Sequence, residues 1–369
     1  MSQKQKRIVM GVFFAAIVTM IAGGGFLLYR QIDQGGDGPN PQADTTLPPA
    51  SAEPAPTEDP HAGMVRSGMT GQWVKESTEN QRPFAVMINN IEYAFQRQRG
   101  TSKADILYEA LAEGGITRML AIYQDVRKVK QIGSVRSARH YYAQFAYEWD
   151  AIYCHFGHTK YAVSKMKKLK TQNLSGLSGI GPVVYSRVSG IAAPHNVYTT
   201  GKKLIKGAKK LGYSTKKRSG RSAEHFTFYD TDTDLGFGKE TKKVIIPFSN
   251  YSTCQMKYNK KKKKYMKYEY GQKHMDAQNK KQLSFKNVII QLVDETNIDR
   301  NGYQTMTLSG TGKGYYITNG KRTAITWRRN ESSNTMTYKD KDGRTLMVNP
   351  GKTYIAVYPN SRKKFIRFQ

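Results

Sequence analysis

The first feature of the hydrophobic pattern is an uncharged apolar run from Ile8 to Tyr29, which follows Lys4, Lys6 and Arg7. A helix rises about 1.5 Å per residue, so a run of this length crosses the ~30 Å hydrocarbon core of a bilayer. Basic residues beside a first span stay on the cytoplasmic side. Residues 1–32 are therefore predicted to form a cytoplasmic tip and a single-pass signal-anchor in the cell membrane. The remainder of the chain would be extracellular.

A cleaved signal peptide is the alternative interpretation of this run. Signal peptides have apolar cores of about 7–15 residues that end at a small-residue cleavage site. Here the small residues 22–25 are followed by Phe26, Leu27 and Leu28, which favours an uncleaved anchor. No Cys stands at the end of the run, so we expect no lipid-modified cysteine.

The next segment is polar and proline-rich, with seven prolines between residues 33 and 61 and no Phe, Tyr or Trp. Such a segment buries too little apolar surface to fold, and clustered prolines keep it extended. We predict that residues 33–69 form an extracellular linker.

Strand and helix patterns then alternate. Apolar runs at residues 84–88, 119–123 and 151–156 predict strands. Between them, Ser102 resembles the first residue of a capping box, and Gly114-Gly115 would end the helix that it begins. Further helices are expected from Ser137 to Tyr147 and over residues 161–169. This alternation predicts a layered α/β domain at residues 70–215.

After residue 216 the pattern changes to short segments rich in β-branched and aromatic residues. Turn pairs separate several of them, including Asn319-Gly320 and Asp342-Gly343. We therefore expect residues 216–369 to form a β-rich, mostly antiparallel C-terminal domain. The predicted fold class is α+β, with an N-terminal transmembrane helix and then the layered α/β domain before this β-rich part.

The chain is strongly basic, with 59 Lys and Arg against 28 Asp and Glu and a net charge of +31. An exported basic protein attracts polyanions such as lipid headgroups or phosphate-rich wall polymers. A solvated lysine-rich surface is the alternative, and a loop or hairpin tip is the expected place for the run from Lys260 to Lys264. No nucleic-acid motif accompanies the charge, so we expect no nucleic-acid partner.

Only two cysteines are present, Cys154 and Cys254, so the chain is no disulfide scaffold. They could form one bond in an oxidising compartment. We expect them to stay unpaired, because they fall in different predicted domains.

Glu109 and Glu113 are four residues apart and would share one face of the predicted helix. Two carboxylates in that arrangement could act as acid and base, as glycoside hydrolysis requires. The alternative is that they form ion pairs with Arg118, Arg136 or Arg139.

The segment from Gly133 to Arg139 runs from a loop containing Ser134 into a predicted helix and carries Arg136 and Arg139. A helix N-terminus favours an anion, and arginine binds carboxylate or phosphate through two hydrogen bonds. An internal ion-pair network with the two glutamates is the other interpretation, and the two are compatible.

His155 and His158 follow a predicted strand, and His195 lies in the compact Pro194-His195-Asn196 cluster. Their spacing matches no metal motif, and the chain has no nucleotide-binding glycine pattern or nucleophile elbow. We predict no metal and no cofactor.

Several long motifs resemble the YerB-like family of exported proteins of Gram-positive bacteria, catalogued as a domain of unknown function with a C-terminal partner domain. The matching segments are residues 82–90 (RPFAVMINN), 104–109 (ADILYE), 112–118 (AEGGITR), 133–139 (GSVRSAR), 193–198 (APHNVY), Thr326-Trp327 and 349–353 (NPGKT). The resemblance implies a two-domain ectodomain on a cell surface and implies no activity. Many members resemble lipoproteins, whereas this chain has an apolar run without a lipid-acceptor cysteine.

Together these patterns predict a membrane-anchored extracellular protein that binds an anionic cell-envelope polymer or peptidoglycan fragment. The candidate ligand-binding residues are Asn89, Asn90, Arg118, Ser134, Arg136, Arg139, His155, His195 and Asn196. The first alternative is a wall glycan- or peptide-acting enzyme with Glu113 as acid or base and Glu109 or His155 as its partner. The second is a scaffold for a membrane-bound wall or conjugation assembly, which would recruit membrane or wall-assembly proteins.

Overall fold

The computed structural model describes residues 59–219, 225–330 and 335–369, and residues 59–369 form one compact unit. The predicted anchor from Ile8 to Tyr29 and most of the predicted linker lie outside the described residues. Within the described residues, no helix has both the length and the apolar character needed to span a membrane.

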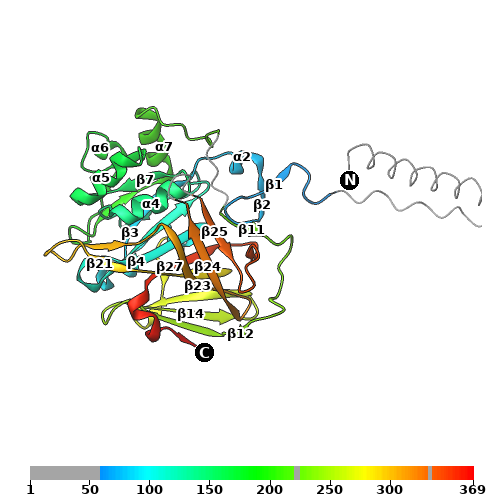
Figure 1. Cartoon of the computed structure of the whole chain (residues 1–369). Helices are drawn as coiled ribbons and strands as arrows, with labels where there is room; N and C mark the ends of the chain where they lie inside the picture. Colours follow the sequence, from blue (N-terminus) through cyan, green and yellow to red (C-terminus); the bar gives the residue numbers. More distant parts are fainter. Residues whose placement is uncertain (1–58, 220–224, 331–334) are drawn as a thin grey trace, which may run out of the picture. The chain divides into compact units, whose positions relative to one another are not determined.

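A mixed sheet of eleven strands runs through the described part of the chain (Figure 1). Its order is β12 (Lys239–Glu240), β24 (Lys321–Arg329), β23 (Gly310–Thr318), β20 (Asn287–Val293), β27 (Thr353–Pro359), β4 (Ile106–Leu111), β5 (Thr117–Tyr123), β3 (Phe84–Asn89), β7 (Ile152–His155) and β8 (Asn173–Ser175), with β25 (Met336–Lys339) paired to β24. The strands expected at residues 84–88, 119–123 and 151–156 are confirmed as β3, β5 and β7.

β27 joins the two halves of the sequence, because it pairs in parallel with β20 on one side and with β4 on the other. Every residue of these three strands is buried. Strands covered on both faces read as continuous apolar runs, which explains the composition of residues 287–293 and 353–359. The boundary expected at residues 215 and 216 therefore separates two stretches of sequence that share one sheet and one core.

The prediction of a helix from Ser102 to Glu113 is wrong. Residues 101–103 form one short turn, η1 (Thr101–Lys103), and the chain then enters the central strand β4. A short apolar run fits a buried strand as well as one face of a helix, and periodicity alone does not distinguish them. Pairing with β5 and β27 on both sides decides the conformation.

Four helices, α4 (His140–Glu148), α5 (Lys160–Lys168), α6 (Gly181–Val184) and α7 (Gly201–Lys210), gather at one end of the folded body (Figure 1). Thr159 and Thr200 cap α5 and α7, because each side-chain oxygen accepts a hydrogen bond from a backbone N–H of the first turn. The helix predicted to begin at Ser137 begins after Arg139, without a side-chain cap. The shorter helical segments are α2 (Glu76–Glu79), α3 (Glu92–Phe95), η2 (Glu113–Gly115) and η3 (Asn360–Phe365).

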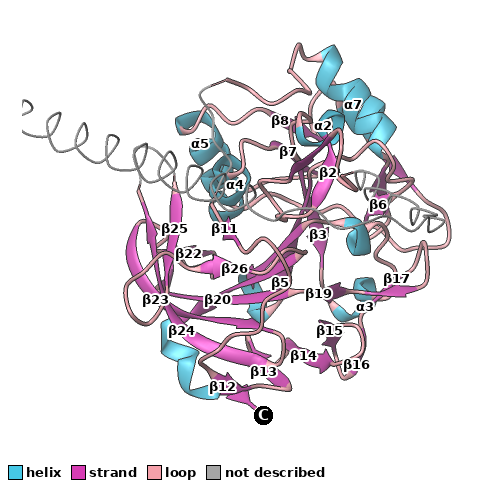
Figure 2. Cartoon of the chain, turned by 90° about the vertical axis from the view of Figure 1, so that its right-hand side faces the viewer, coloured by secondary structure: helices cyan, strands magenta, loops and turns pink. Residues whose placement is uncertain are grey.

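A second, antiparallel sheet has the order β16 (Gln272–Lys273), β15 (Lys264–Glu269), β14 (Thr253–Asn259), β13 (Lys243–Pro247) and β28 (Arg367–Phe368), with β19 (Ser284–Phe285) beside β15 (Figure 2). Residues 260–263 of the lysine run form the turn between β14 and β15, and Lys264 begins β15, which confirms the expected hairpin tip. The described chain is thus α+β with a mostly antiparallel, β-rich C-terminal part. Cys154 and Cys254 are buried and unpaired, on β7 and β14.

Small sheets complete the unit. They are β6 (Ile132–Gly133), β10 (Val197–Thr199) and β9 (Ser186–Arg187), and the pairs β1 (Met64–Arg66) with β2 (Trp73–Lys75), β11 (Thr227–Phe228) with β26 (Met347–Val348), β17 (Met275–Asp276) with β18 (Lys281–Gln282), and β21 (Glu295–Asn297) with β22 (Gln304–Met306).

Candidate functional site

The structure divides the candidate residues into separate groups. The first consists of Glu113, Arg118 and Arg139. Both nitrogens of the Arg139 fork donate to the Glu113 carboxylate, and Arg118 Nη2 lies 3.3 Å from Glu113 Oε1. Both arginine side chains are buried, while Glu113 keeps 28% of its side chain exposed. This group corresponds to the internal ion-pair interpretation of the motif.

The second group, the Arg136 group, comprises Asn89, Arg136, Pro194 and His195. Asn89 ends β3, and its side-chain amide lies 2.8 Å from His195 Nδ1. Arg136 Nη1 donates to the Pro194 carbonyl at 3.3 Å. Val135 N donates to the Val197 carbonyl, which ties the two motif segments together.

Arg136 differs from the other two motif arginines. Among the described residues, no carboxylate forms an ion pair with it. Burial, followed by repulsion from Arg118, lowers the pKa of Arg136 to about 10, so the guanidinium stays charged at neutral pH. A half-buried cation without an internal anion is suited to an external one.

The imidazole of His195 is neutral at neutral pH. Burial lowers its pKa, and the positive charge of Arg136 lowers it further. The ring also lies 5.2 Å from the ring of Tyr93, in a tilted arrangement. His195 can therefore offer a hydrogen bond next to Arg136 without adding a charge. The neighbouring Asn196 instead accepts a hydrogen bond from Arg187 at 2.6 Å.

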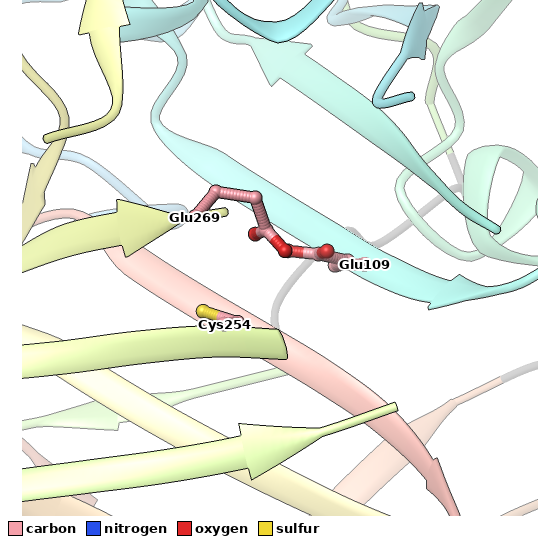
Figure 3. Close-up of side chains that lie close together, drawn as sticks. All are labelled: Glu109, Cys254 and Glu269. Atoms are coloured by element: carbon pink, nitrogen blue, oxygen red, sulfur yellow. The ribbon is translucent and has the colours of Figure 1, made fainter. Parts of the chain in front are cut away.

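The third group is a closed polar cluster around Glu109, which we call the Glu109 cluster. Glu109 lies on β4 and is fully buried, so it shares no helical face with Glu113. Asn90 Nδ2 donates to Glu109 Oε1 at 2.9 Å, and Lys267 Nζ lies 3.1 Å from Glu109 Oε2. Lys267 also pairs with Glu269. Figure 3 shows the carboxylates of Glu109 and Glu269 pointing toward one another, with Cys254 on a neighbouring strand.

The ligand atoms of Glu109, Cys254 and Glu269 lie within 4.8 Å of one another, as in a metal site. However, the ammonium of Lys267 contacts both carboxylates and supplies the positive charge that a metal ion would bring. Burial raises the pKa of Cys254 above its ordinary range, so its thiol is not a ready thiolate ligand. We therefore interpret the cluster as an internal ion-pair network.

His155 and Ser134 are fully buried. His155 Nδ1 can donate to the Gly157 carbonyl at 2.8 Å, and Nε2 lies 3.2 Å from the side-chain amide of Asn173. Burial lowers the pKa of His155 to about 4. Ser134 Oγ has no hydrogen-bond partner among the described residues. Within the described residues, no hydrogen bond joins the side chain of His155 or Ser134 to the Arg136 group.

Sequence reasoning missed Lys267, Glu269 and His274, which complete the Glu109 cluster. His274 Nδ1 lies 3.2 Å from Lys267 Nζ. The missed signal is the alternation along β15, where Tyr265, Lys267 and Glu269 all face inward. Two charged residues on the apolar face of a strand indicate a buried ion pair.

Two family models match this chain. Residues 69–214 match the N-terminal domain, and residues 244–355 the C-terminal domain, of a protein family of unknown function, DUF3048. "Putative lipoprotein YerB" of Bacillus subtilis (strain 168) is 30% identical over 300 residues, which cover 81% of this chain and 88% of the relative. The crystal structure of YerB from Bacillus subtilis matches with a TM-score of 0.73 and 28% identity, covering 83% of this chain and 99% of that one.

Proposed function

Because this chain belongs to the YerB-like DUF3048 family, we propose that it is a membrane-anchored extracellular protein that binds an anionic cell-envelope ligand through Arg136. The name of the Bacillus subtilis relative, "Putative lipoprotein YerB", supports attachment to a membrane. In this chain the proposed anchor is the apolar run from Ile8 to Tyr29, with the N-terminus inside.

The observation that carries the binding proposal is the state of Arg136. It keeps its charge in a half-buried position and has no carboxylate partner among the described residues, whereas Arg118 and Arg139 both form ion pairs with Glu113. A guanidinium can form two parallel hydrogen bonds with a phosphate or a carboxylate. The neutral His195, whose Nδ1 is held by the buried Asn89, would contact a sugar or amide group beside it.

The acid–base alternative is weakened by the burial of Glu109. Its carboxylate is fully buried and held by Asn90 and Lys267, so a wall glycan cannot reach it without unfolding the cluster. Glu113 would then act without its proposed carboxylate partner. For this reason we propose binding and not hydrolysis.

The proposal is tested by Arg136→Ala in the full-length chain purified in a mild detergent. We expect the variant to bind a purified phosphate-rich wall polymer at least about tenfold more weakly than the wild type, because a charge-assisted hydrogen bond is lost. The affinity is measured by biolayer interferometry at fixed ionic strength, since exposed charges are screened by salt.

Arg344→Ala is the matched control. Arg344 lies between β25 and β26 and is exposed, and its removal changes the net charge by the same amount. It should change the affinity by less than about twofold, in line with the small effect of exposed charges. Equal loss of affinity in the two variants would mean that the polymer responds to net charge only, and the Arg136 proposal would be wrong.

A further inference from the structure

A cavity of about 270 Å³ lies between α4, α5, β22 and the end of β24, outside the groups described above. It is lined by His140, Tyr141, Gln144, Lys165, Thr305, Met306, Thr307, Leu308, Ser309 and Arg329. Polar side chains predominate, and none of these lining residues is acidic. The cavity therefore combines positive charge with hydroxyl groups.

Arg329 is the most informative residue of the wall. It ends β24 and is only 3% exposed. Its Nη2 forms an ion pair with Glu148 Oε2 at 2.5 Å, whereas Nε and Nη1 form no hydrogen bond with any described residue. Glu148 thus compensates the charge of Arg329 and leaves the donors on Nε and Nη1 unsatisfied. A guanidinium has five N–H donors, and leaving buried donors unsatisfied is costly.

The other side chains of the wall add donors from several directions. Thr305, Thr307 and Ser309 contribute hydroxyl groups. His140 Nε2 lies 3.0 Å from Thr305 Oγ1 and orients that hydroxyl.

We propose that this cavity binds the phosphoryl group of a small phosphate or phosphate monoester. A phosphoryl group has three terminal oxygens in a tetrahedral arrangement, so it accepts hydrogen bonds from the arginine fork and the hydroxyls together. A planar carboxylate would satisfy fewer of these groups. This site is additional to the Arg136 group, with which it shares no residue.

The test is isothermal titration calorimetry on the full-length chain in detergent, with inorganic phosphate, glycerol 3-phosphate and acetate as separate probes. We expect one-to-one binding of at least one of the two phosphates, and at least about tenfold weaker binding of acetate. Stronger binding of glycerol 3-phosphate would identify an ester as the ligand, and equal or stronger binding of inorganic phosphate would identify the free ion. Acetate binding of equal strength would overturn the proposal.

Arg329→Lys is the decisive variant, because it keeps a positive charge beside Glu148 and removes the fork of donors. We expect at least about tenfold weaker phosphate binding, as for the loss of a charge-assisted hydrogen bond. Arg328→Lys is the matched control, since Arg328 is the exposed neighbour on the same strand and points to the other face. It should bind as the wild type does.

A second variant keeps the test valid if Arg329→Lys fails to fold. Thr305→Val combined with Ser309→Ala removes two hydroxyls and leaves the Arg329–Glu148 pair in place. This double variant should also bind phosphate at least about tenfold more weakly. Unchanged binding in the double variant, or no phosphate binding by the wild type, would show that the cavity is not a phosphoryl site.

Discussion

At the scale of single residues, the buried charges are the unusual feature of this protein. Two glutamates and one lysine of the Glu109 cluster are fully buried. Burying charges is costly, and one ammonium between two carboxylates leaves an excess negative charge. Burial and, secondly, the charge of Glu109 raise the pKa of Glu269 from 4.5 to about 7. A proton on Glu269 therefore relieves the excess charge near neutral pH.

This shift predicts a pH dependence of stability. Between pH 4.5 and about 7, folded Glu269 holds a proton that the unfolded chain releases, so its contribution to the free energy of unfolding falls as pH rises. Glu269→Gln is neutral at every pH and should remove this fall. In this variant, the free energy of unfolding measured with urea should fall less between pH 4.5 and pH 7 than it does in the wild type. The difference should be up to about 3 kcal/mol.

The matched control for this prediction is Glu240→Gln, because Glu240 is an exposed glutamate. Its change in stability between the two pH values should equal that of the wild type. His155, whose pKa is lowered to about 4, makes an opposite contribution to the pH dependence of stability. This contribution is the same in the wild type and in both variants, so it cancels in the comparison. A Glu269→Gln variant with the wild-type pH dependence would refute the buried-proton interpretation.

At the scale of elements, β3, β5, β7 and the β23–β24 hairpin at Asn319-Gly320 could be predicted from the sequence, because apolar runs and turn residues are local signals. The strand β4 could not be predicted from the sequence. Its sequence, ILYEAL, fits a helix face until its two strand neighbours are known. That single error also misplaced Glu109, since a helix would have put it beside Glu113 and the strand places it inside the core.

Helix α7 shows how contacts between elements override local propensity. Gly201 begins the helix, where a Cβ would lie 1.8 Å from the Val126 carbonyl oxygen. An alanine normally stabilises a helix by about 1 kcal/mol relative to a glycine. Here Gly201→Ala should instead lower the free energy of unfolding by about 1–3 kcal/mol through overpacking, as measured by urea unfolding.

Gly179→Ala serves as the control for this substitution, because a Cβ at Gly179 meets no atom within 4 Å. It should leave the free energy of unfolding within about 0.5 kcal/mol of the wild-type value. If Gly201→Ala is as stable as the wild type, the approach to Val126 does not constrain the helix.

At the scale of the molecule, the segments before and after residue 216 are joined by one sheet. β27 comes from the end of the chain and lies between β20 and β4, and the core is continuous across this junction. Without β27, β4 would expose a long apolar edge, which favours aggregation. The two family segments are therefore expected to depend on one another for stability.

This arrangement predicts a single unfolding transition for residues 59–369. Differential scanning calorimetry should give one peak with equal calorimetric and van't Hoff enthalpies, the signature of two-state unfolding. A fragment of residues 59–215 should show no cooperative transition, because it lacks β27. Two separate peaks, or a cooperative transition in the fragment, would show that the segments fold independently.

The sequence by itself determined the family, the basic charge, the α+β class and the presence of the Gly133–Arg139 motif, because these depend on composition and on short-range patterns. Only the tertiary structure decided which motif residues are available to a ligand. Arg118, Arg136 and Arg139 look alike in the sequence, yet two of them form ion pairs with Glu113 and one does not. The cluster of Glu109 with Lys267 and Glu269, and the cavity beside Arg329, also arise from pairings between distant strands. The pairing of strands that are distant in the sequence decides which of these side chains meet, and a local pattern of side chains carries little information about that pairing.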